Sequence, residues 1–307
     1  MKRKDKIRVA QIGVGYWGPN ILRNMMANEN CDLTIVVEIS SERREYVKNS
    51  YSTITVTDKI SKVLEDPDID AVLIVTPVET HFKLAVESLK AGKHILVEKP
   101  MATSVEEIEE IQKIAKEKNL IAMVGHTFIY NPAVRYVKDL IDNQILGDIR
   151  YIYSRRLNLG RIRSDVDAFW NLAPHDISII QYWLNNPSPV NVSRNGMDYI
   201  QKGIDDVVFV NIEYPQNIIA NIHVSWLDPN KVRKITLVGS EKMVVYDDLA
   251  ENKIEIYDKG IDHMASLGDR MDYDIPRDTT FQYRSGDIFI PKIKWEEPLK
   301  VEWNNFL

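Results

Sequence analysis

The sequence predicts an α/β protein with a doubly wound, mainly parallel sheet in its first part and an α+β domain with a large antiparallel sheet in the rest. In the first part, continuous β-branched runs such as Ala71–Val75 alternate with amphipathic stretches. This pattern is typical of strands covered on both faces by helices. After about residue 126, strand-like runs follow one another through short turns, which favours antiparallel pairing. The expected domains are therefore residues 1–125 and 126–307.

Six strands are expected in the first domain, with a helical stretch after most of them. The strands are Ile7–Ile12, Leu33–Glu38, Ile54–Thr57, Ala71–Thr76, His94–Glu98 and Ile121–Val124. Pro19 suits the first turn of a helix that follows the first strand. Ser104 and Glu107 form a capping box at the start of another helix. Gly92 is placed where a helix should end.

The second domain is expected to hold two helices and a broad sheet. The helices are Ala133–Asn143 and His175–Leu184; the strands are Arg150–Asn158, Val207–Tyr214, Ile218–Ser225, Lys234–Val238, Met243–Tyr246 and Ile254–Tyr257. We expect this broad sheet to have one open face that can pair with another subunit.

Composition and charge narrow the class of protein. The chain has 307 residues, 44% of them hydrophobic and 27% charged, with a net charge of −6 and basic residues spread along its length. This favours a globular protein without a nucleic-acid partner. No apolar run approaches the length of a membrane span. Cys31 is the only cysteine, which suits a reducing compartment. We expect a cytoplasmic protein.

A glycine turn, Gly13-Val14-Gly15-Tyr16-Trp17-Gly18, follows the first strand and opens a helix. Three glycines at this spacing allow a tight turn, close approach of a pyrophosphate, and close packing of the helix on the strand. The helix N-terminus then presents free N–H groups to the phosphates. An acid, Glu38, ends the next strand 20 residues after Gly18, which completes the dinucleotide fingerprint.

The same acid indicates which dinucleotide is bound. Glu38 should accept hydrogen bonds from the adenosine ribose and repel a 2′-phosphate, which favours NAD. Ser40 and Arg43 lie close behind it, together with Ser41 and Arg44. An arginine there can accommodate a 2′-phosphate, so NADP is the alternative. We predict NAD, with residues 16, 17, 40 and 43 lining the cofactor.

Three further segments carry chemistry-bearing residues. They are Thr76-Pro77-Val78-Glu79-Thr80-His81, Glu98-Lys99-Pro100 and Trp170-Asn171-Leu172-Ala173-Pro174-His175-Asp176. The first two follow strands, so they lie at the carboxyl edge of the sheet, where open α/β sheets bind ligands. With the glycine turn, the three segments resemble the Gfo/Idh/MocA family. Thr76-Pro77 with His81 is similar to its T-P-x-x-x-H element, and Glu98-Lys99-Pro100 to its E-K-P signature.

The resemblance implies a Rossmann domain, an open-faced antiparallel sheet, and assembly into homodimers or homotetramers. It also implies that Lys99 contacts the reacting hydroxyl and that His175 is the catalytic histidine. Histidine suits a general base near neutral pH, and a fixed cation can stabilise developing alkoxide. Residues 76, 77, 81, 98 and 100 are expected at the nicotinamide end of the cofactor.

The second domain is similar to one branch of this family, which includes UDP-N-acetylglucosamine 3-dehydrogenases and other sugar-nucleotide oxidoreductases. The branch resemblance is carried by the stretch from Arg155 to Arg161, the stretch around His175, and Ser225-Trp226-Leu227-Asp228-Pro229. Guanidinium groups suit phosphates and carboxylates. The expected substrate ligands are Lys99, Tyr130, Asn131, Arg155, Arg156, Asn158, Arg161, Asn171 and His175. Equally, the arginines could simply face solvent from a half-buried strand.

Two positions depart from the family pattern. Many members carry a carboxylate four residues before the histidine, where this chain has Asn171. An amide can hydrogen-bond the ring but adds no negative charge to it. The chain also ends soon after Glu297, where related chains continue, so its C-terminus is expected to be shortened.

The sequence thus predicts an NAD(P)-dependent dehydrogenase acting on CH–OH groups. The leading reaction is hydride transfer between a secondary sugar hydroxyl, C3 of a UDP-N-acetylhexosamine, and nicotinamide. A free-sugar or inositol dehydrogenase is the nearest alternative. A nicotinamide-binding regulator without catalysis is an alternative of another class, against which the presence of both Lys99 and His175 speaks. No residues show the spacing of metal ligands, so no metal is expected.

Overall fold

The computed structural model describes residues 6–160, 162–263 and 281–307, and these form two compact units. Residues 1–131 and 296–307 make the first unit, and residues 132–295 the second. The first unit therefore ends at residue 131, where the sequence suggested 125. It also includes the last residues of the chain, because a C-terminal helix packs into its core.

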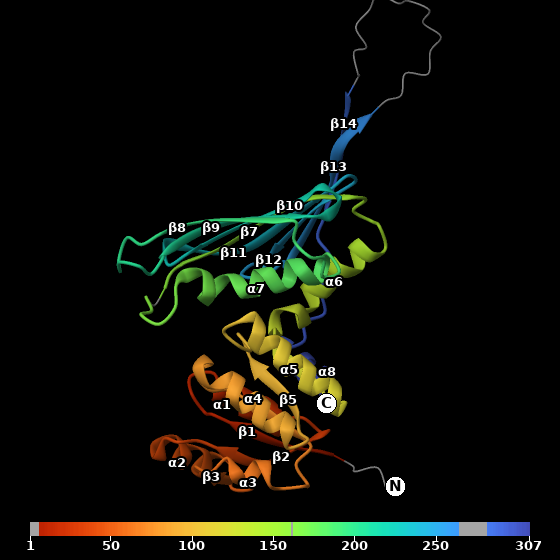
Figure 1. Ribbon diagram of the computed structural model, residues 1–307. Coiled ribbons are helices and arrows are strands. Elements are labelled where there is room, and N and C mark those ends of the chain that lie inside the picture. Colours follow the sequence, from red (N-terminus) through yellow and green to blue (C-terminus); the bar gives the residue numbers. More distant parts are fainter. Residues whose placement is uncertain (1–5, 161, 264–280) are drawn as a thin grey trace, which may run out of the picture. The chain divides into compact units, whose positions relative to one another are not determined.

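The first unit is built on a six-stranded sheet of order β3-β2-β1-β4-β5-β6, all parallel (Figure 1). Its strands are β1 (Ile7–Ile12), β2 (Cys31–Val37), β3 (Thr55–Thr57), β4 (Ala71–Ile74), β5 (His94–Glu98) and β6 (Ala122–Gly125). The prediction of a doubly wound parallel sheet is confirmed. The strand order reverses between β1 and β4. Open α/β sheets bind ligands beyond the carboxyl ends of the strands at such a switch point.

Helices flank this sheet and connect its strands. They are α1 (Gly18–Met26), α2 (Ser41–Ser50), α3 (Ser61–Leu64), η1 (Val78–Thr80), α4 (His81–Lys90), α5 (Val105–Lys118), η2 (Thr127–Tyr130) and α8 (Pro298–Phe306). The predicted cap of α5 is present, since Ser104 Oγ accepts the Glu107 N–H at 3.2 Å. Gly92 follows α4 with φ +79°, a left-handed conformation that favours glycine and ends the helix.

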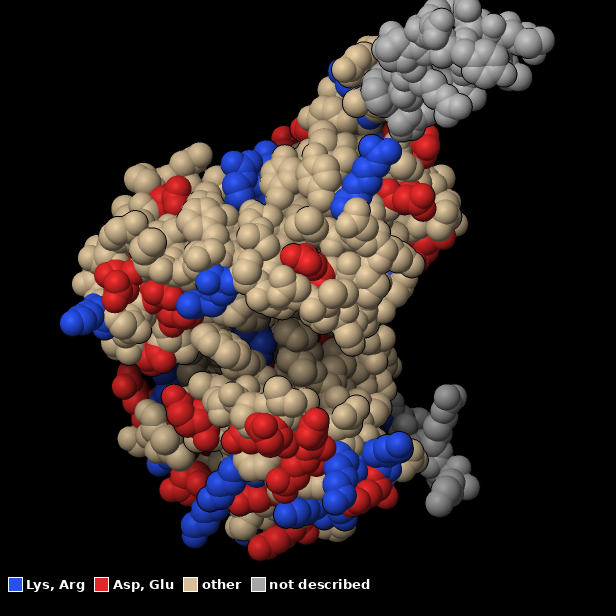
Figure 2. Space-filling model, turned by 45° about the horizontal axis from the view of Figure 1, so that its top comes forward, with Lys and Arg blue, Asp and Glu red and all other residues tan. Residues whose placement is uncertain are grey.

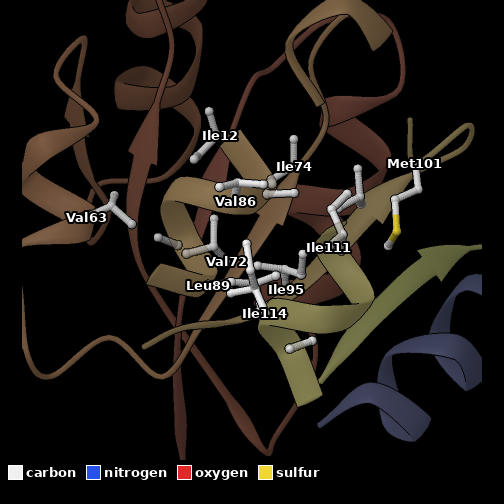
Figure 3. Packing of buried hydrophobic residues seen from close by; sticks show 14 of the residues in the cluster. Ile12, Val63, Val72, Ile74, Val86, Leu89, Ile95, Met101, Ile111 and Ile114 are labelled. Carbon is white, nitrogen blue, oxygen red and sulfur yellow. The ribbon is translucent and has the colours of Figure 1, made fainter. Parts of the chain in front are cut away.

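Two apolar layers hold the first unit together, one on each face of the sheet. On one face, Ile12, Val72, Ile74 and Ile95 pack against α4 and α5 (Figure 3). On the other face, the alternate residues of the same strands pack against α1 and α8. Burying each of these side chains contributes roughly 1.5–3 kcal/mol, so both faces need their helices.

The second unit contains an eight-stranded sheet of order β14-β13-β12-β11-β7-β10-β9-β8 (Figure 1). The strands are β7 (Ile149–Leu159), β8 (Asn191–Met197), β9 (Val207–Tyr214), β10 (Ile218–Ser225), β11 (Leu227–Gly239), β12 (Met243–Asp247), β13 (Ile254–His263) and β14 (Phe281–Phe289). The expected antiparallel sheet is confirmed for the most part. One pair, β7 with β10, runs parallel, because the chain crosses from β7 through helix α7 and strands β8 and β9 before returning.

This unit contains the helices α6 (Pro132–Asp142) and α7 (Ala168–Trp183). A hydrogen bond joins them: Trp183 Nε1 donates to the Val134 carbonyl at 2.9 Å. Helix α7 begins seven residues before the expected start at His175. Asp167 caps it, accepting the Trp170 N–H at 2.8 Å, and Pro174 lies inside the helix rather than before it. Prolines are common in the first turn of a helix and rare in its interior, so local rules do not predict a helix that runs through Pro174.

Helix α7 packs on strands β7, β9 and β10 and covers one face of the sheet. The other face carries exposed aromatic and apolar side chains, including Tyr151, Tyr153, Phe209 and Ile219. Over this unit, Figure 2 shows mostly uncharged side chains. Among the helices of the described residues, none is long and apolar enough to cross a membrane.

Candidate active site

The glycine turn after β1 has the geometry that its spacing predicts. Gly13 has φ +94°, and a Cβ there would lie 2.5 Å from the Val75 carbonyl oxygen. A Cβ on Gly18 would lie 3.3 Å from the Gly13 oxygen, so helix α1 starts in close contact with the turn. In contrast, a Cβ on Gly15 would meet no described atom within 4 Å. Gly15 therefore leaves open backbone beside a helix N-terminus, which fits a pyrophosphate.

A buried glutamine of β1 holds this turn through hydrogen bonds. Gln11 is fully buried in β1, and its Nε2 donates to the Gly13 carbonyl at 2.8 Å and to the Gly18 carbonyl at 3.4 Å. It thus holds both ends of the turn. The Tyr16 side chain is 94% exposed, whereas Trp17 is 41% exposed.

Glu38 closes the turn from the end of β2. It is buried, and its carboxylate accepts the Val14 N–H at 2.6 Å and the Ser40 N–H at 2.9 Å. Each oxygen retains acceptor capacity for a ribose hydroxyl. Arg44 donates to the backbone carbonyls of Glu38 and Ile39, both at 2.8 Å, and is thereby held away from the carboxylate. Arg43 lies exposed on the first turn of α2.

The T-P-x-x-x-H element and the E-K-P signature are tied together through His81. The ring is buried, with Nδ1 2.7 Å from the Pro100 carbonyl oxygen and Nε2 2.8 Å from the Thr76 carbonyl oxygen. Both nitrogens therefore contact backbone, so His81 fixes the ends of β4 and β5 relative to each other. The expected position of His81 at the nicotinamide end of the cofactor stays a prediction.

Glu98 and Lys99 stand at the carboxyl end of β5, and the Lys99–Pro100 peptide bond is cis. Burial raises the pKa of Glu98 to about 7, against the opposing effects of the Lys99 N–H, the Lys99 charge and a hydrogen bond from the Trp17 side chain. The Trp17 bond joins the glycine turn to the E-K-P segment. A carboxyl group that titrates near neutral pH thus lies beside the lysine expected to contact the reacting hydroxyl.

A second buried acid, Glu302, reaches the same region from α8. It is 1% exposed and accepts a hydrogen bond from Thr127 Oγ1 at 2.8 Å. Burial, with a smaller contribution from the charge of Glu98, raises its pKa to about 8 against the opposing effect of the Thr127 hydrogen bond. His126, between β6 and η2, has its pKa lowered to about 4, mainly by burial and then by the Lys99 charge. The sequence reasoning did not single out Gln11, His126, Asp176 or Glu302.

In the second unit, His175 lies on α7 with Asn171 one turn before it on the same side of the helix. The Asn171 side-chain oxygen accepts the Trp226 indole N–H at 3.2 Å. The helix therefore allows the Asn171 amide to lie near the His175 ring, as the sequence predicted. Asn171 is also held by Trp226, which lies between β10 and β11. The Ser178 hydroxyl donates to the His175 carbonyl at 2.8 Å.

Strand alternation separates the two arginines of β7. Arg156 points toward α7 and makes a bidentate ion pair with Asp176, with N–O distances of 2.7 and 2.9 Å. Arg155 is exposed on the opposite face of the sheet, away from α7. Arg156 is therefore paired inside the second unit, whereas Arg155 lies on the face of the sheet away from α7; their expected roles as substrate ligands stay predictions.

The remaining expected substrate ligands have different surroundings. Tyr130 is buried, and its hydroxyl bonds to the side-chain oxygen of Asn305 in α8 at 2.9 Å. Asn131 is buried at the end of the first unit. Asn158 is half-buried near the end of β7, against Gly160. Arg161 lies outside the described residues.

The fold and the glycine turn with its acid define a dinucleotide-binding oxidoreductase. Comparison with protein families agrees: residues 7–126 match the model described as "Oxidoreductase family, NAD-binding Rossmann fold", and residues 134–245 match the "GFO/IDH/MocA C-terminal domain". The chain belongs to the Gfo/Idh/MocA oxidoreductase family, as its motifs predicted, and NAD is its cofactor class.

Individual relatives are similar over part or all of the chain. UDP-N-acetylglucosamine 3-dehydrogenase of Acidithiobacillus ferrooxidans is 29% identical over 194 residues, 63% of this chain and 60% of that protein. Its crystal structure matches 98% of this chain and 88% of its own at 24% identity, with a TM-score of 0.77. Scyllo-inositol dehydrogenase of Lactobacillus casei, solved with NAD(H) and scyllo-inositol, covers 80% of this chain and 78% of its own at 21% identity and a TM-score of 0.73.

Four of the curated relatives that this chain matches in sequence, among them the UDP-N-acetylglucosamine 3-dehydrogenase, are covered over 51 to 60% of their own length. The similarity in structure at these identities establishes the shared two-domain fold. The family match agrees with an NAD-binding oxidoreductase class, and the dehydrogenase activity itself is a proposal.

Proposed function

We propose that this protein transfers a hydride between a secondary sugar hydroxyl and NAD, with C3 of a UDP-N-acetylhexosamine as the substrate position. The observation that carries the proposal is Lys99 at the carboxyl end of β5, next to a buried acid that is tied to the glycine turn through Trp17. The sequence similarity to UDP-N-acetylglucosamine 3-dehydrogenase supports the choice of substrate.

Bound NAD supplies the hydride acceptor for this chemistry. The open backbone at Gly15 and the N-terminus of α1 would hold its pyrophosphate, and the Glu38 carboxylate its adenosine ribose. In the proposed mechanism, Lys99 orients the hydroxyl oxygen and stabilises its developing negative charge. An imidazole nitrogen of His175 takes the hydroxyl proton.

The cofactor preference we propose is NAD over NADP. The Glu38 carboxylate is fixed by two backbone N–H groups, and a 2′-phosphate beside it would meet a buried acceptor. Arg43, exposed on α2, is the residue that could favour NADP instead. Measuring both Michaelis constants tests this, and a clear preference for NADP would overturn it. In that case, Arg43→Ala should weaken NADP selectively.

We further propose a cytoplasmic homo-oligomer that pairs through the open face of the second unit's sheet. The exposed aromatic and apolar side chains of that face support the proposal, since contiguous apolar surface marks interaction sites. The buried free thiol of Cys31 is consistent with a reducing compartment. Light scattering on the purified chain should report a dimer or tetramer, and replacing Tyr151 and Phe209 by Lys should shift it toward monomer.

A substrate panel followed by NADH absorbance tests the reaction. Turnover of UDP-N-acetylhexosamines is expected. Turnover of free sugars or inositols but no UDP-sugar would favour the second candidate, an inositol or free-sugar dehydrogenase. The fold shared with scyllo-inositol dehydrogenase supports this candidate. NADH binding with no turnover of any substrate would favour the regulator.

Two variants test the roles of the proposed catalytic residues. Lys99→Ala and His175→Ala should each lower kcat by roughly 100-fold or more while leaving the NADH dissociation constant within about twofold. Gly15→Ala is the matched control for cofactor binding: it meets free space in the folded protein, so it should weaken NADH without lowering stability. Near-native turnover by His175→Ala would show that the base is another group.

A further inference from the structure

The turn of α7 that carries His175 has a weak point in its backbone. Pro174 lies in the interior of this helix, directly before His175. Proline has no N–H, so the Trp170 carbonyl loses its usual donor four residues on, and the pyrrolidine ring crowds that turn. The helical hydrogen-bond ladder alone therefore holds this turn less firmly than it holds the rest of the helix.

A buried ion pair anchors the same turn to the sheet. Asp176 follows His175 directly, and Arg156 of β7 donates to both of its carboxylate oxygens, Nε at 2.7 Å and Nη2 at 2.9 Å. The two side chains are only 4% and 2% exposed. A planar bidentate pair fixes distance and rotation together, which a single apolar contact does not.

Other polar groups also act on the Arg156 guanidinium. Burial lowers the pKa of the Arg156 guanidinium, but the combined effects of Asp176, Tyr246 and Asp248 outweigh burial, so the pKa is raised overall. The Tyr246 hydroxyl in turn donates to Asp248 at 3.0 Å, so two of these groups are hydrogen-bonded to each other. Since opposite charges cancel within the pair, it places little net charge next to His175.

We propose that Arg156 and Asp176 are positioning residues for His175, which hold the proline-interrupted turn of α7 at a fixed distance and rotation on strand β7. If stability were the only role, well-packed apolar side chains would serve as well, because replacing a buried ion pair in this way is often neutral or stabilising. The proposal rests on the proposed function in that it takes His175 as the base. Arg156 acts through the helix and not through the substrate.

The test needs a measurement of His175 that does not depend on turnover. In histidine-labelled protein, the ring resonances of His175 are assigned from the peak that His175→Gln removes among the six histidines. The double variant Arg156→Met with Asp176→Leu should fold but should broaden, split or shift these resonances. The matched control, Lys234→Met with Asp247→Asn, removes a partly exposed ion pair of the same sheet and should leave them unchanged.

Once a substrate is found, the double variant should lower kcat at least tenfold with the Michaelis constant for NAD unchanged, and the control pair should not. If the double variant does not fold, Arg156→Lys keeps the charge, loses the fork, and is measured instead. Wild-type His175 resonances in a folded double variant, or in Arg156→Lys, would overturn the positioning role. Failure of the proposed function would appear separately, as undiminished turnover by His175→Ala or as no turnover by the wild type.

Discussion

Helices α7 and α8 each bury one acid within an apolar stripe, but they give it different partners. In α7 the stripe is Asp176, Ile179, Ile180 and Trp183, and in α8 it is Leu299, Glu302, Trp303 and Phe306. Both follow the i, i+3, i+4, i+7 spacing of a helix face that packs inward. Asp176 meets a guanidinium, whereas Glu302 meets the hydroxyl of Thr127 and the charge of Glu98.

The difference shows how the partner decides what a buried carboxyl can do. Two hydrogen bonds from one arginine fix the position of the Asp176 carboxyl group. Among the described residues, no Lys or Arg pairs with Glu302, and burial favours its neutral form. The second unit thus holds a fixed anchor, while the first unit holds a group that exchanges its proton near neutral pH.

The largest expected effect comes from removing one member of the buried ion pair between Arg156 and Asp176. Asp176→Ala would leave Arg156 as an uncompensated buried charge, which costs about 3–5 kcal/mol. Replacing both members by apolar side chains should cost far less. Urea unfolding, with hydrogen exchange of β7 and α7 amides to locate the loss, measures both. Equal destabilisation by the single and double variants would mean that the pair, and not the orphaned charge, supplies the stability.

The unpaired acid should make stability depend on pH. The folded-state pKa of Glu302, about 8, lies above its ordinary value of 4.5, so the folded protein retains a proton that the unfolded chain releases. This contribution is fully present below pH 4.5 and is lost as pH rises through 8, at about 1.4 kcal/mol per pH unit at most. Glu302→Gln mimics the neutral acid and lacks the dependence. Urea unfolding at pH 5 and 8.5 should therefore give a wild-type-minus-variant difference that changes by on the order of 3 kcal/mol; a constant difference would contradict a neutral Glu302.

His126 should produce the opposite dependence in the same unit. Its pKa is lowered from 6.5 to about 4, so the unfolded chain takes up a proton that the folded protein resists. The associated stability is present above pH 6.5 and is lost as pH falls through 4. Substitution by Gln should remove an acid-limb loss of on the order of 2 kcal/mol between pH 7 and 4. An unchanged acid limb would show that the ring is protonated in the folded state as well.

Local sequence rules account for most of the fold. The continuous apolar runs, the glycine turn and the α5 cap follow from periodicity and backbone conformation, and the structure contains them. The parallel pairing of β7 with β10 depends on which distant strand lies alongside, which no local pattern encodes. Strand β8 was missed because its residues are mostly exposed and polar and do not alternate.

The site divides in the same way. Gly13, Glu38 and Lys99 stand in motifs that the sequence displays, and the roles of Lys99 and His175 stay predictions. Asp176 and Glu302 were visible as acids on apolar helix faces, a signal that marks a buried partner without naming it. Only the packed structure identifies Arg156 as the partner of Asp176 and Thr127 as the partner of Glu302, because each partner lies on a different element of the chain.

The smallest expected effect isolates the hydrogen bond that Glu302 accepts from Thr127. Thr127→Val keeps the shape of the side chain and removes the hydroxyl that donates to Glu302 Oε2 at 2.8 Å. Losing one such bond costs about 1 kcal/mol. The Thr127 bond also lowers the pKa of this acid, so its loss should move the alkaline limb of the stability curve to higher pH. In the Glu302→Gln background the amide can still accept the hydroxyl, so the cost should persist there while the shift of the limb disappears. A shift that survives in that background would assign the alkaline limb to Glu98, the other buried carboxyl of this unit, and would confine the contrast with α7 to a difference in hydrogen bonding.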